Sequence, residues 1–353
     1  MALSQRSLKK MGFSQVEPNL YRAHLEHYAV DLFVQEKTQL TVCFDHLGRP
    51  EALPTREREG WGKSFLESHT DHSGLFIKPD RTNWFREPGL IEFLRSIGDI
   101  GLFSNFKKTM TYGGSMGGYA AIAFADLCHA TTVFSLNPQA TLRQDAVPWE
   151  PRFLNGKEED WDGPLWLASD GCKKASKVFL VYDRQFTLDR KHVEMMDLPN
   201  VVELNVPFVG HKVPKHLRNM GCLDDLYHSI SEENYDTCTW QKRVRARRKL
   251  PEYRETLLSS ASGPRKRTLE KILARLKLLD PEELANLERK EKRDLARIIG
   301  FSTWIARYKS DNPSAPQEEI KIAWAEARES ETQAGIRALA AVERAGYQIV
   351  PPE

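Results

Sequence analysis

Short apolar runs alternate with amphipathic stretches over roughly the first two thirds of this chain. Runs of five or six mainly apolar or β-branched residues have the length and composition of buried strands. These are 40–44, 74–78, 107–112, 131–136, 177–182 and 201–206, with entry strands and turns before residue 40. Helix-favouring segments lie between them, as at 88–97. This alternation predicts an α/β fold, with a mostly parallel sheet and helices on both faces.

The alternation of apolar runs and helix-favouring segments stops between residues 137 and 176, a stretch that contains four prolines and several aromatic side chains. We therefore expect a cap-like insertion at about 137–176. Trp149 and Trp161 in the insertion, with Trp84 on an earlier loop, are candidates to line an apolar or sugar-stacking pocket. The alternative is that these tryptophans only pack on the sheet.

The composition changes again near residue 232. We expect an α/β domain over 1–232 and a helical region over 233–353 that begins with a basic cluster at 242–249. Amphipathic helices are expected over 268–279, 281–299 and 316–345. Leu269, Ile272, Leu273, Leu276 and Leu279 would share one apolar face. This region could pack on the first domain, on a partner protein or on a second copy.

Charge and cysteine content narrow the function classes. The 353 residues carry 51 basic and 49 acidic side chains, a net charge of +2. Acidic residues follow the basic cluster closely and no aromatic residues interleave it, so nucleic-acid binding is not expected. No run approaches the roughly 18 apolar residues of a membrane span, and residues 1–10 lack an apolar signal core, which favours a cytoplasmic protein. Five scattered cysteines suggest reduced thiols, and no metal or cofactor is expected.

The segment Tyr112–Tyr119 reads Tyr-Gly-Gly-Ser-Met-Gly-Gly-Tyr and matches a nucleophile elbow, Gly-x-Ser-x-Gly. An expected strand precedes it and an expected helix follows. Side chains at Gly113 or Gly117 would collide with neighbouring backbone. The helix after Ser115 would direct its positive end at the site where an oxyanion forms. Ser115 is thus the candidate nucleophile.

A serine hydroxyl needs a base to remove its proton and an acid to orient that base. His211 follows the expected strand 201–206 and is the candidate base, ahead of three histidines on expected helices, His192, His216 and His228. Asp183 directly follows the strand 177–182 and is the expected acid. Asp189 is the alternative, although we expect it to cap the helix that it opens.

An oxyanion also needs backbone donors. Met116 N–H directly after the serine is one candidate. The loop after strand 40–44 is expected to supply the second, from Asp45 or His46. Metal binding by this adjacent pair is disfavoured, because no further well-spaced ligands accompany it.

These residues resemble the α/β-hydrolase superfamily over about residues 25–230, and most of all a set of bacterial proteins with this elbow. Asn83-Trp84-Phe85-Arg86 resembles their upstream segment, and Asp183 follows its strand as their acid does. The resemblance implies acyl hydrolysis or acyl transfer by Ser115, His211 and Asp183, with Met116 N–H as an oxyanion donor. The lipase-type His-Gly-Gly-Gly loop is missing, so no substrate class is carried over.

The sequence therefore predicts a serine hydrolase that cleaves an ester-like acyl bond in a small or glycan-linked substrate. Two alternatives stay open. The same residues could transfer an acyl group to a glycan or another hydroxyl, if the 137–176 region excludes water. The chain could also be a non-catalytic binding or assembly protein on a hydrolase scaffold.

Overall fold

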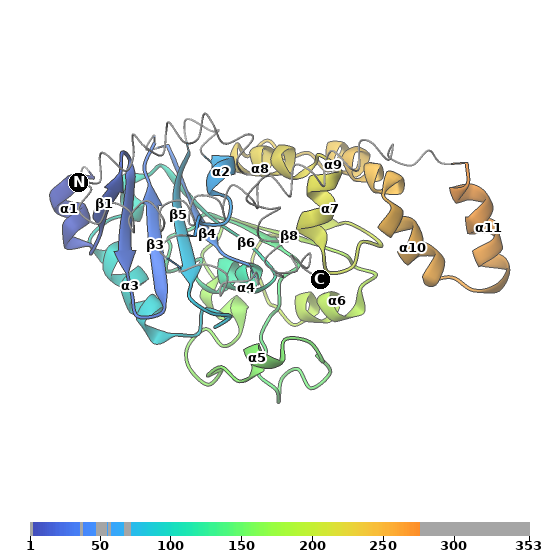
Figure 1. Cartoon of the computed structure of the whole chain (residues 1–353), viewed down its shortest axis with the longest axis horizontal. Helices are drawn as coiled ribbons and strands as arrows, with labels where there is room; N and C mark the ends of the chain where they lie inside the picture. The colour runs from blue at the N-terminus through green and yellow to red at the C-terminus, as the bar shows by residue number, and fades with distance from the viewer. Residues whose placement is uncertain (1–2, 36–37, 47–54, 56–57, 67–71, 276–353) are drawn as a thin grey trace, which may run out of the picture. The chain divides into compact units, whose positions relative to one another are not determined.

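A computed structural model describes residues 3–35, 38–46, 55, 58–66 and 72–275. Residues 1–51 and 60–279 group into one compact unit, which holds every helix and strand named below (Figure 1). The predicted helices over 281–299 and 316–345 lie outside the described residues, and the predicted domain boundary at 232 stays a prediction.

The described residues form nine strands. They are β1 (Ser14–Glu17), β2 (Leu20–His24), β3 (Tyr28–Phe33), β4 (Gln39–Phe44), β5 (His72–Pro79), β6 (Lys108–Gly114), β7 (Thr132–Leu136), β8 (Lys177–Tyr182) and β9 (Val201–Asn205). Their order in the sheet is β1-β2-β3-β5-β4-β6-β7-β8-β9. The pairs from β1 to β5 are antiparallel, and those from β5 through β4 to β9 are parallel. The predicted mostly parallel sheet is confirmed.

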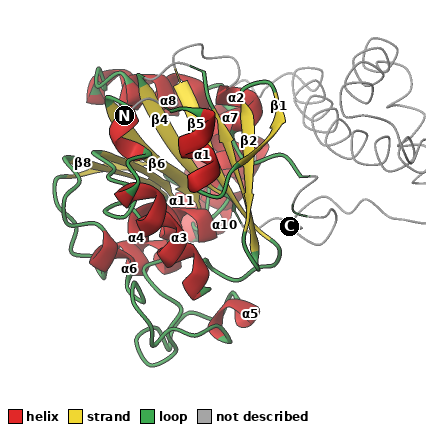
Figure 2. Cartoon of the chain, turned by 90° about the vertical axis from the view of Figure 1, so that its left-hand side faces the viewer, coloured by secondary structure: helices red, strands yellow, loops and turns green. Residues whose placement is uncertain are grey.

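Helices lie on both sides of this sheet (Figure 2). The α-helices are α1 (Gln5–Lys10), α2 (Lys63–Leu66), α3 (Pro88–Asp99), α4 (Met116–Ala123), α5 (Leu154–Lys157), α6 (Thr187–Glu194), α7 (Val213–Asn219), α8 (Leu223–Ser231), α9 (Thr237–Arg243), α10 (Pro251–Ser259) and α11 (Gly263–Leu273). One core cluster joins α1, α3, α4 and α6 to the sheet, and a second joins α2, α7, α8 and α9 to it. Neighbouring residues of a central strand enter opposite clusters, as Val133 and Phe134 do, because successive side chains alternate between faces. This is the layered α/β architecture that the sequence predicts, with helices packed on both faces of the sheet.

The 137–176 segment is mostly loop, with α5 and a short 3₁₀ helix at Ala168–Gly171. Arg86 anchors it: its guanidinium donates to the carbonyls of Asp160 and Pro164, each at 2.9 Å, and to the Tyr119 hydroxyl at 2.9 Å. A charged side chain that is 8 % exposed can be buried here because its donors have partners. These hydrogen bonds connect the chain around residues 160–164 to the loop before α3 and to α4.

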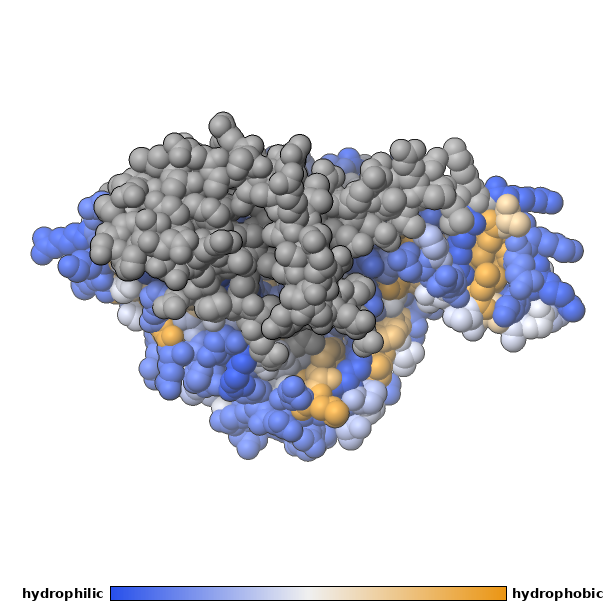
Figure 3. Space-filling model, in the orientation of Figure 1, coloured by the Kyte–Doolittle hydropathy of each residue, from blue (hydrophilic) through white to orange (hydrophobic). Residues whose placement is uncertain are grey.

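The helices after residue 232 run from α9 through a basic 3₁₀ turn, Val244–Lys249, to α10 and α11. Leu250, Tyr253, Leu257 and Leu273 form a small core between them. Of the predicted apolar face, Leu273 is buried but Ile272 is 51 % exposed, and Leu276 and Leu279 lie outside the described residues. Figure 3 shows hydrophobic side chains along α11 among hydrophilic ones. In the part of the chain described here, no helix has both the length and the apolar character of a membrane span.

Candidate active site

The serine elbow has the geometry that its glycines suggested. β6 ends at Gly114 and α4 begins at Met116, so Ser115 occupies the turn, with φ 53° and ψ −118°. A Cβ on Gly113 would lie 2.0 Å from the Gly117 carbonyl oxygen, and one on Gly117 would lie 2.4 Å from the Phe44 oxygen. Only glycine allows the strand, turn and helix to approach this closely. The left-handed φ of Ser115 is a strained conformation of the kind found at functional sites.

His211 lies on the loop between β9 and α7 and reaches the serine. The Ser115 hydroxyl is 2.9 Å from His211 Nε2, within hydrogen-bond distance. Ser115 is half-buried, and the imidazole is 25 % exposed. The pair is thus partly exposed to solvent. His192 and His216 lie on helices and are buried, whereas His228 is half-buried, and none of these three contacts Ser115.

The acid that meets His211 is Asp189, not Asp183. His211 Nδ1 lies 2.8 Å and 3.0 Å from the two carboxylate oxygens of Asp189, whose side chain is fully buried. A carboxylate only accepts, so Nδ1 carries the proton and Nε2 is left to accept from the serine. The expectation that Asp189 caps α6 is also wrong, because Phe186 is the N-cap and Asp189 lies in the first turn.

Asp183 instead holds the loop that carries His211. Its Oδ2 accepts hydrogen bonds from the backbone N–H of Val209 and of Gly210, both at 2.9 Å, and its Oδ1 accepts from Gln185 N–H at 2.9 Å. The side chain at the strand end is aimed at the neighbouring loop, not at the imidazole. The position of Asp183 directly after β8 made it the expected acid, but position along the connection does not fix which carboxylate points toward His211.

Met116 occupies the first position of α4, where the backbone N–H has no partner within the helix. The second predicted donor needs a correction. Asp45 N–H donates to the Ile77 carbonyl at 3.3 Å and so continues the sheet ladder. His46, which is exposed, remains the candidate on this loop.

Two of the three tryptophans predicted to bind substrate, Trp84 and Trp161, belong to the buried core, whereas the role of Trp149 stays a prediction. Trp84 is fully buried and Trp161 is 4 % exposed, and the two rings pack together with centroids 6.3 Å apart. Trp149 is half-buried, but it packs against His192 at 4.8 Å. For Trp84 and Trp161 the packing alternative holds, because a large aromatic ring in a core removes more apolar surface from water than a ring on an exposed loop does.

Other side chains, which the sequence did not single out, surround the pair. The rings of Phe153 and Phe186 lie 5.7 Å and 6.5 Å from the His211 ring. Gln139 Oε1 is 3.3 Å from Ser115 Oγ. Asn137 Nδ2 is 3.2 Å from each nitrogen of His211. Asn137 and Gln139 directly follow β7, and a polar residue at the carboxyl end of a parallel strand was the available signal.

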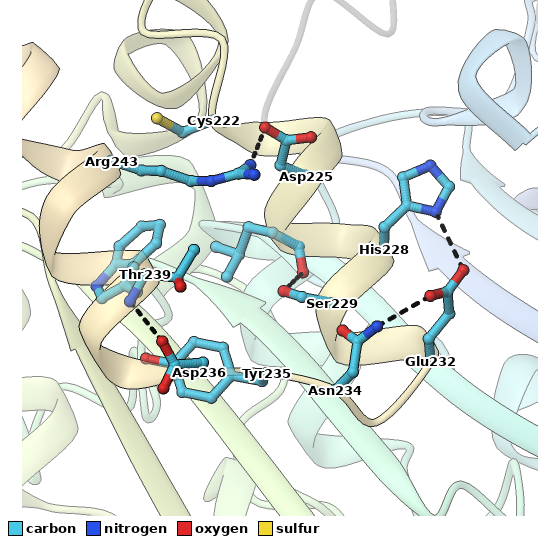
Figure 4. A pocket seen from close by; sticks show the side chains of 12 residues that line it. Cys222, Asp225, His228, Ser229, Glu232, Asn234, Tyr235, Asp236, Thr239 and Arg243 are labelled. Carbon is cyan, nitrogen blue, oxygen red and sulfur yellow. Dashed lines mark hydrogen bonds and ion pairs between the residues drawn. The ribbon is translucent and has the colours of Figure 1, made fainter.

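A separate hollow of about 440 Å³ lies between α8, α9 and the loop that joins them (Figure 4). Among its lining side chains, Arg243 forms an ion pair with Asp225, and His228 lies 4.0 Å from Glu232. None of Ser115, His211 and Asp189 lines it. Within the described ranges, no three His, Cys, Asp or Glu side chains gather as metal ligands.

Comparisons with solved structures give matches of low sequence identity and low structural similarity. Est1E from Butyrivibrio proteoclasticus is 13 % identical with a TM-score of 0.42, and the match covers 61 % of this chain and 98 % of that one. The capsule O-acetyltransferase of Neisseria meningitidis serogroup A is 13 % identical with a TM-score of 0.40, covering 58 % and 93 %. A sugar hydrolase from Lactococcus lactis is 14 % identical with a TM-score of 0.41, covering 64 % and 99 %.

No family model matches the chain, and no curated protein sequence matches it significantly. At this level of similarity neither a substrate nor a mechanism is carried over to this chain.

Proposed function

We propose that this protein is a serine hydrolase that cleaves an ester-like acyl bond through an acyl-enzyme. The observation that carries the proposal is the continuous line of hydrogen-bond distances from Ser115 Oγ through His211 to Asp189, 2.9 Å and 2.8 Å. Nucleophile, base and orienting acid in this arrangement are recognised by geometry rather than by sequence position.

In the proposed reaction Ser115 Oγ attacks the carbonyl carbon, and its proton passes to His211 Nε2. Asp189 stabilises the imidazolium that results. The N–H groups of Met116 and His46 hold the oxyanion. The intermediate collapses when the bond to the leaving oxygen breaks and that oxygen takes the proton from His211. Water, deprotonated by His211, then attacks the acyl-enzyme and frees the serine.

The accessibility of the site favours this reading over a purely structural scaffold. A scaffold need not keep a strained serine beside an imidazole that is 25 % exposed. Acyl transfer to a hydroxyl acceptor would use the same three residues and would differ only in the second half-reaction.

The direct test is labelling of the purified protein by a fluorophosphonate probe, which phosphonylates activated serines. The wild type is expected to label, and Ser115→Ala to lose labelling entirely. Ser176→Ala, an exposed serine at the edge of β8, is the matched control and is expected to label like the wild type. A folded wild-type protein that does not label would overturn the proposal. Once labelling is established, p-nitrophenyl acetate with and without a sugar acceptor would separate hydrolysis from transfer.

A further inference from the structure

The carboxylate that orients His211 is also held from its other side, by a side chain of the 137–176 insertion. Arg152 Nη1 and Nη2 both donate to Asp189 Oδ1 at 3.0 Å. The Asp189 side chain is fully buried, and the Arg152 side chain is 20 % exposed. A buried carboxylate with donors on one side only could rotate; donors on two sides fix its plane.

Arg152 is itself held by Glu150. The guanidinium forms a two-pronged ion pair with this carboxylate, Nε to Oε1 at 2.8 Å and Nη2 to Oε2 at 2.6 Å. Glu150 is fully buried, and burial alone would raise the pKa of its carboxyl group. Hydrogen bonds from Arg152 and His192 outweigh burial and lower that pKa to about 2, so Glu150 carries its charge near neutral pH.

His192 completes the support as a neutral imidazole. Its Nδ1 accepts a hydrogen bond from Ala140 N–H at 3.3 Å, so its Nε2 carries the proton and donates to Glu150 Oε2 at 3.0 Å. Burial lowers the pKa of His192, which favours this neutral form. Ala140 adjoins Gln139, which contacts Ser115. One end of this hydrogen-bond network is therefore Asp189, which contacts His211, and the other end lies next to Gln139, which contacts Ser115.

The charges of His211, Asp189, Arg152 and Glu150 sum to zero only while His211 holds the serine proton. With neutral His211, the cluster holds one cation, Arg152, and two anions, Asp189 and Glu150, a net charge of −1. When His211 takes the serine proton, the cluster becomes neutral. Without Glu150, the guanidinium would cancel the charge of Asp189 before the reaction began, and the imidazolium would lose its counter-ion.

We propose that Arg152 is a positioning residue, whose guanidinium fixes the Asp189 carboxylate against His211 while Glu150 preserves the negative charge that the imidazolium needs. This inference rests on the proposed function, because it assigns Arg152 a part in activating Ser115. It also gives the 137–176 insertion a second role, since both Glu150 and Arg152 belong to it. The insertion would complete the orientation of the triad instead of only covering it.

The test compares rates of fluorophosphonate labelling. Arg152→Ala is expected to label about 10- to 100-fold more slowly than the wild type, since small displacements of a catalytic group can cost up to about 100-fold. Millimolar guanidinium, well below denaturing concentrations, is expected to restore much of the lost rate by occupying the vacated site. Arg143→Ala is the matched control: Arg143 belongs to the same insertion and forms a two-pronged pair with Asp145, but that pair is at the surface. It should label at the wild-type rate and not respond to guanidinium.

Glu150→Gln is an independent test of the role of the Glu150 charge. It keeps the shape of the side chain but removes the charge that offsets Arg152, so a folded variant should label more slowly than the wild type, with no rescue by guanidinium. If Arg152→Ala does not fold, Arg152→Lys replaces it. This variant keeps the positive charge, loses the two-pronged geometry and should also label more slowly.

The outcomes separate the two proposals. A folded wild type that does not label refutes the proposed function. If the wild type labels and a folded Arg152→Ala labels equally fast, the positioning role is refuted and the triad stands. Slow labelling that guanidinium does not restore in a folded variant also refutes it, because the loss then reflects packing against the Phe153 and Phe186 rings, which the guanidinium overlies at 4.8 Å and 5.2 Å.

Discussion

Changing Asp189 to asparagine is expected to slow labelling of Ser115, whereas changing Asp183 to asparagine is expected to lower the stability of the fold. Asp189→Asn replaces the acceptor of the His211 Nδ1 proton, now 2.8 Å from Oδ2, with a group that can turn its NH₂ toward the imidazole. The imidazole would then present the wrong tautomer to Ser115. In a comparable triad this change costs about 10⁴-fold in rate, so we expect labelling to slow by about 10³- to 10⁴-fold.

Asp183→Asn should act on stability instead. The carboxylate accepts three backbone hydrogen bonds, two on Oδ2 and one on Oδ1. An amide keeps one oxygen, so its NH₂ must face at least one N–H donor in a site that is 1 % exposed. Losing one hydrogen bond to a charged group costs about 1.5–3 kcal/mol, and we expect the free energy of unfolding to fall by that amount. Labelling of the folded fraction should slow far less than in Asp189→Asn.

The assay pairs urea unfolding with labelling rates measured in buffer for both variants. The reasoning is refuted if Asp183→Asn is as slow as Asp189→Asn while fully folded, because Asp183 would then act on His211 directly. It is equally refuted if Asp189→Asn labels within tenfold of the wild type.

Two further changes test the elbow and the sheet. Gly117→Ala would place a Cβ 2.4 Å from the Phe44 carbonyl oxygen, so we expect a loss of about 3 kcal/mol in urea unfolding and little labelling, whereas Gly89→Ala, whose Cβ would meet nothing within 4 Å, should change neither. Lys78 pairs with Asp31 at 2.6 Å, and burial lowers the pKa of Lys78 from 10.5 to about 8. Between these two pH values the unfolded chain therefore binds more protons than the folded chain. The free energy of unfolding should rise with pH across this range by up to about 3 kcal/mol. Lys78→Met should lack this rise when the unfolding free energies of the two proteins are compared from pH 7.5 to 10.5; equal pH dependence of both would contradict the assigned cause.

The elbow was predictable because its geometry is local. Strand 107–112, the turn at Ser115 and the helix after it are specified by residues adjacent in sequence, and Gly113 is required by a contact within the same turn, although Gly117 is required by its close approach to β4. The sheet was predictable for a related reason. Its strands are apolar runs of five or six residues, and parallel strands buried on both faces need that pattern.

Roles that depend on side-chain direction were not predictable to the same degree. The buried tryptophans show this: the sequence places Trp84 and Trp161 on loops near the site, but only the packing of the insertion decides that both rings lie in the core. For Ile272 the sequence predicted burial and the structure shows exposure. Helical spacing predicts an apolar face, and the neighbouring helix covers only part of it.

The sequence by itself determined the layered α/β fold, the candidate nucleophile Ser115 and the candidate base His211, because periodicity, the Gly-x-Ser-x-Gly spacing and position after a strand are local properties. Tertiary structure alone decided which acid meets the imidazole. Asp183 and Asp189 lie six positions apart on the same connection, and the turn of α6 directs one toward His211 and leaves the other on the loop backbone. It also decided that Arg152 contacts Asp189, since residues 37 positions apart meet only when the insertion folds against α6.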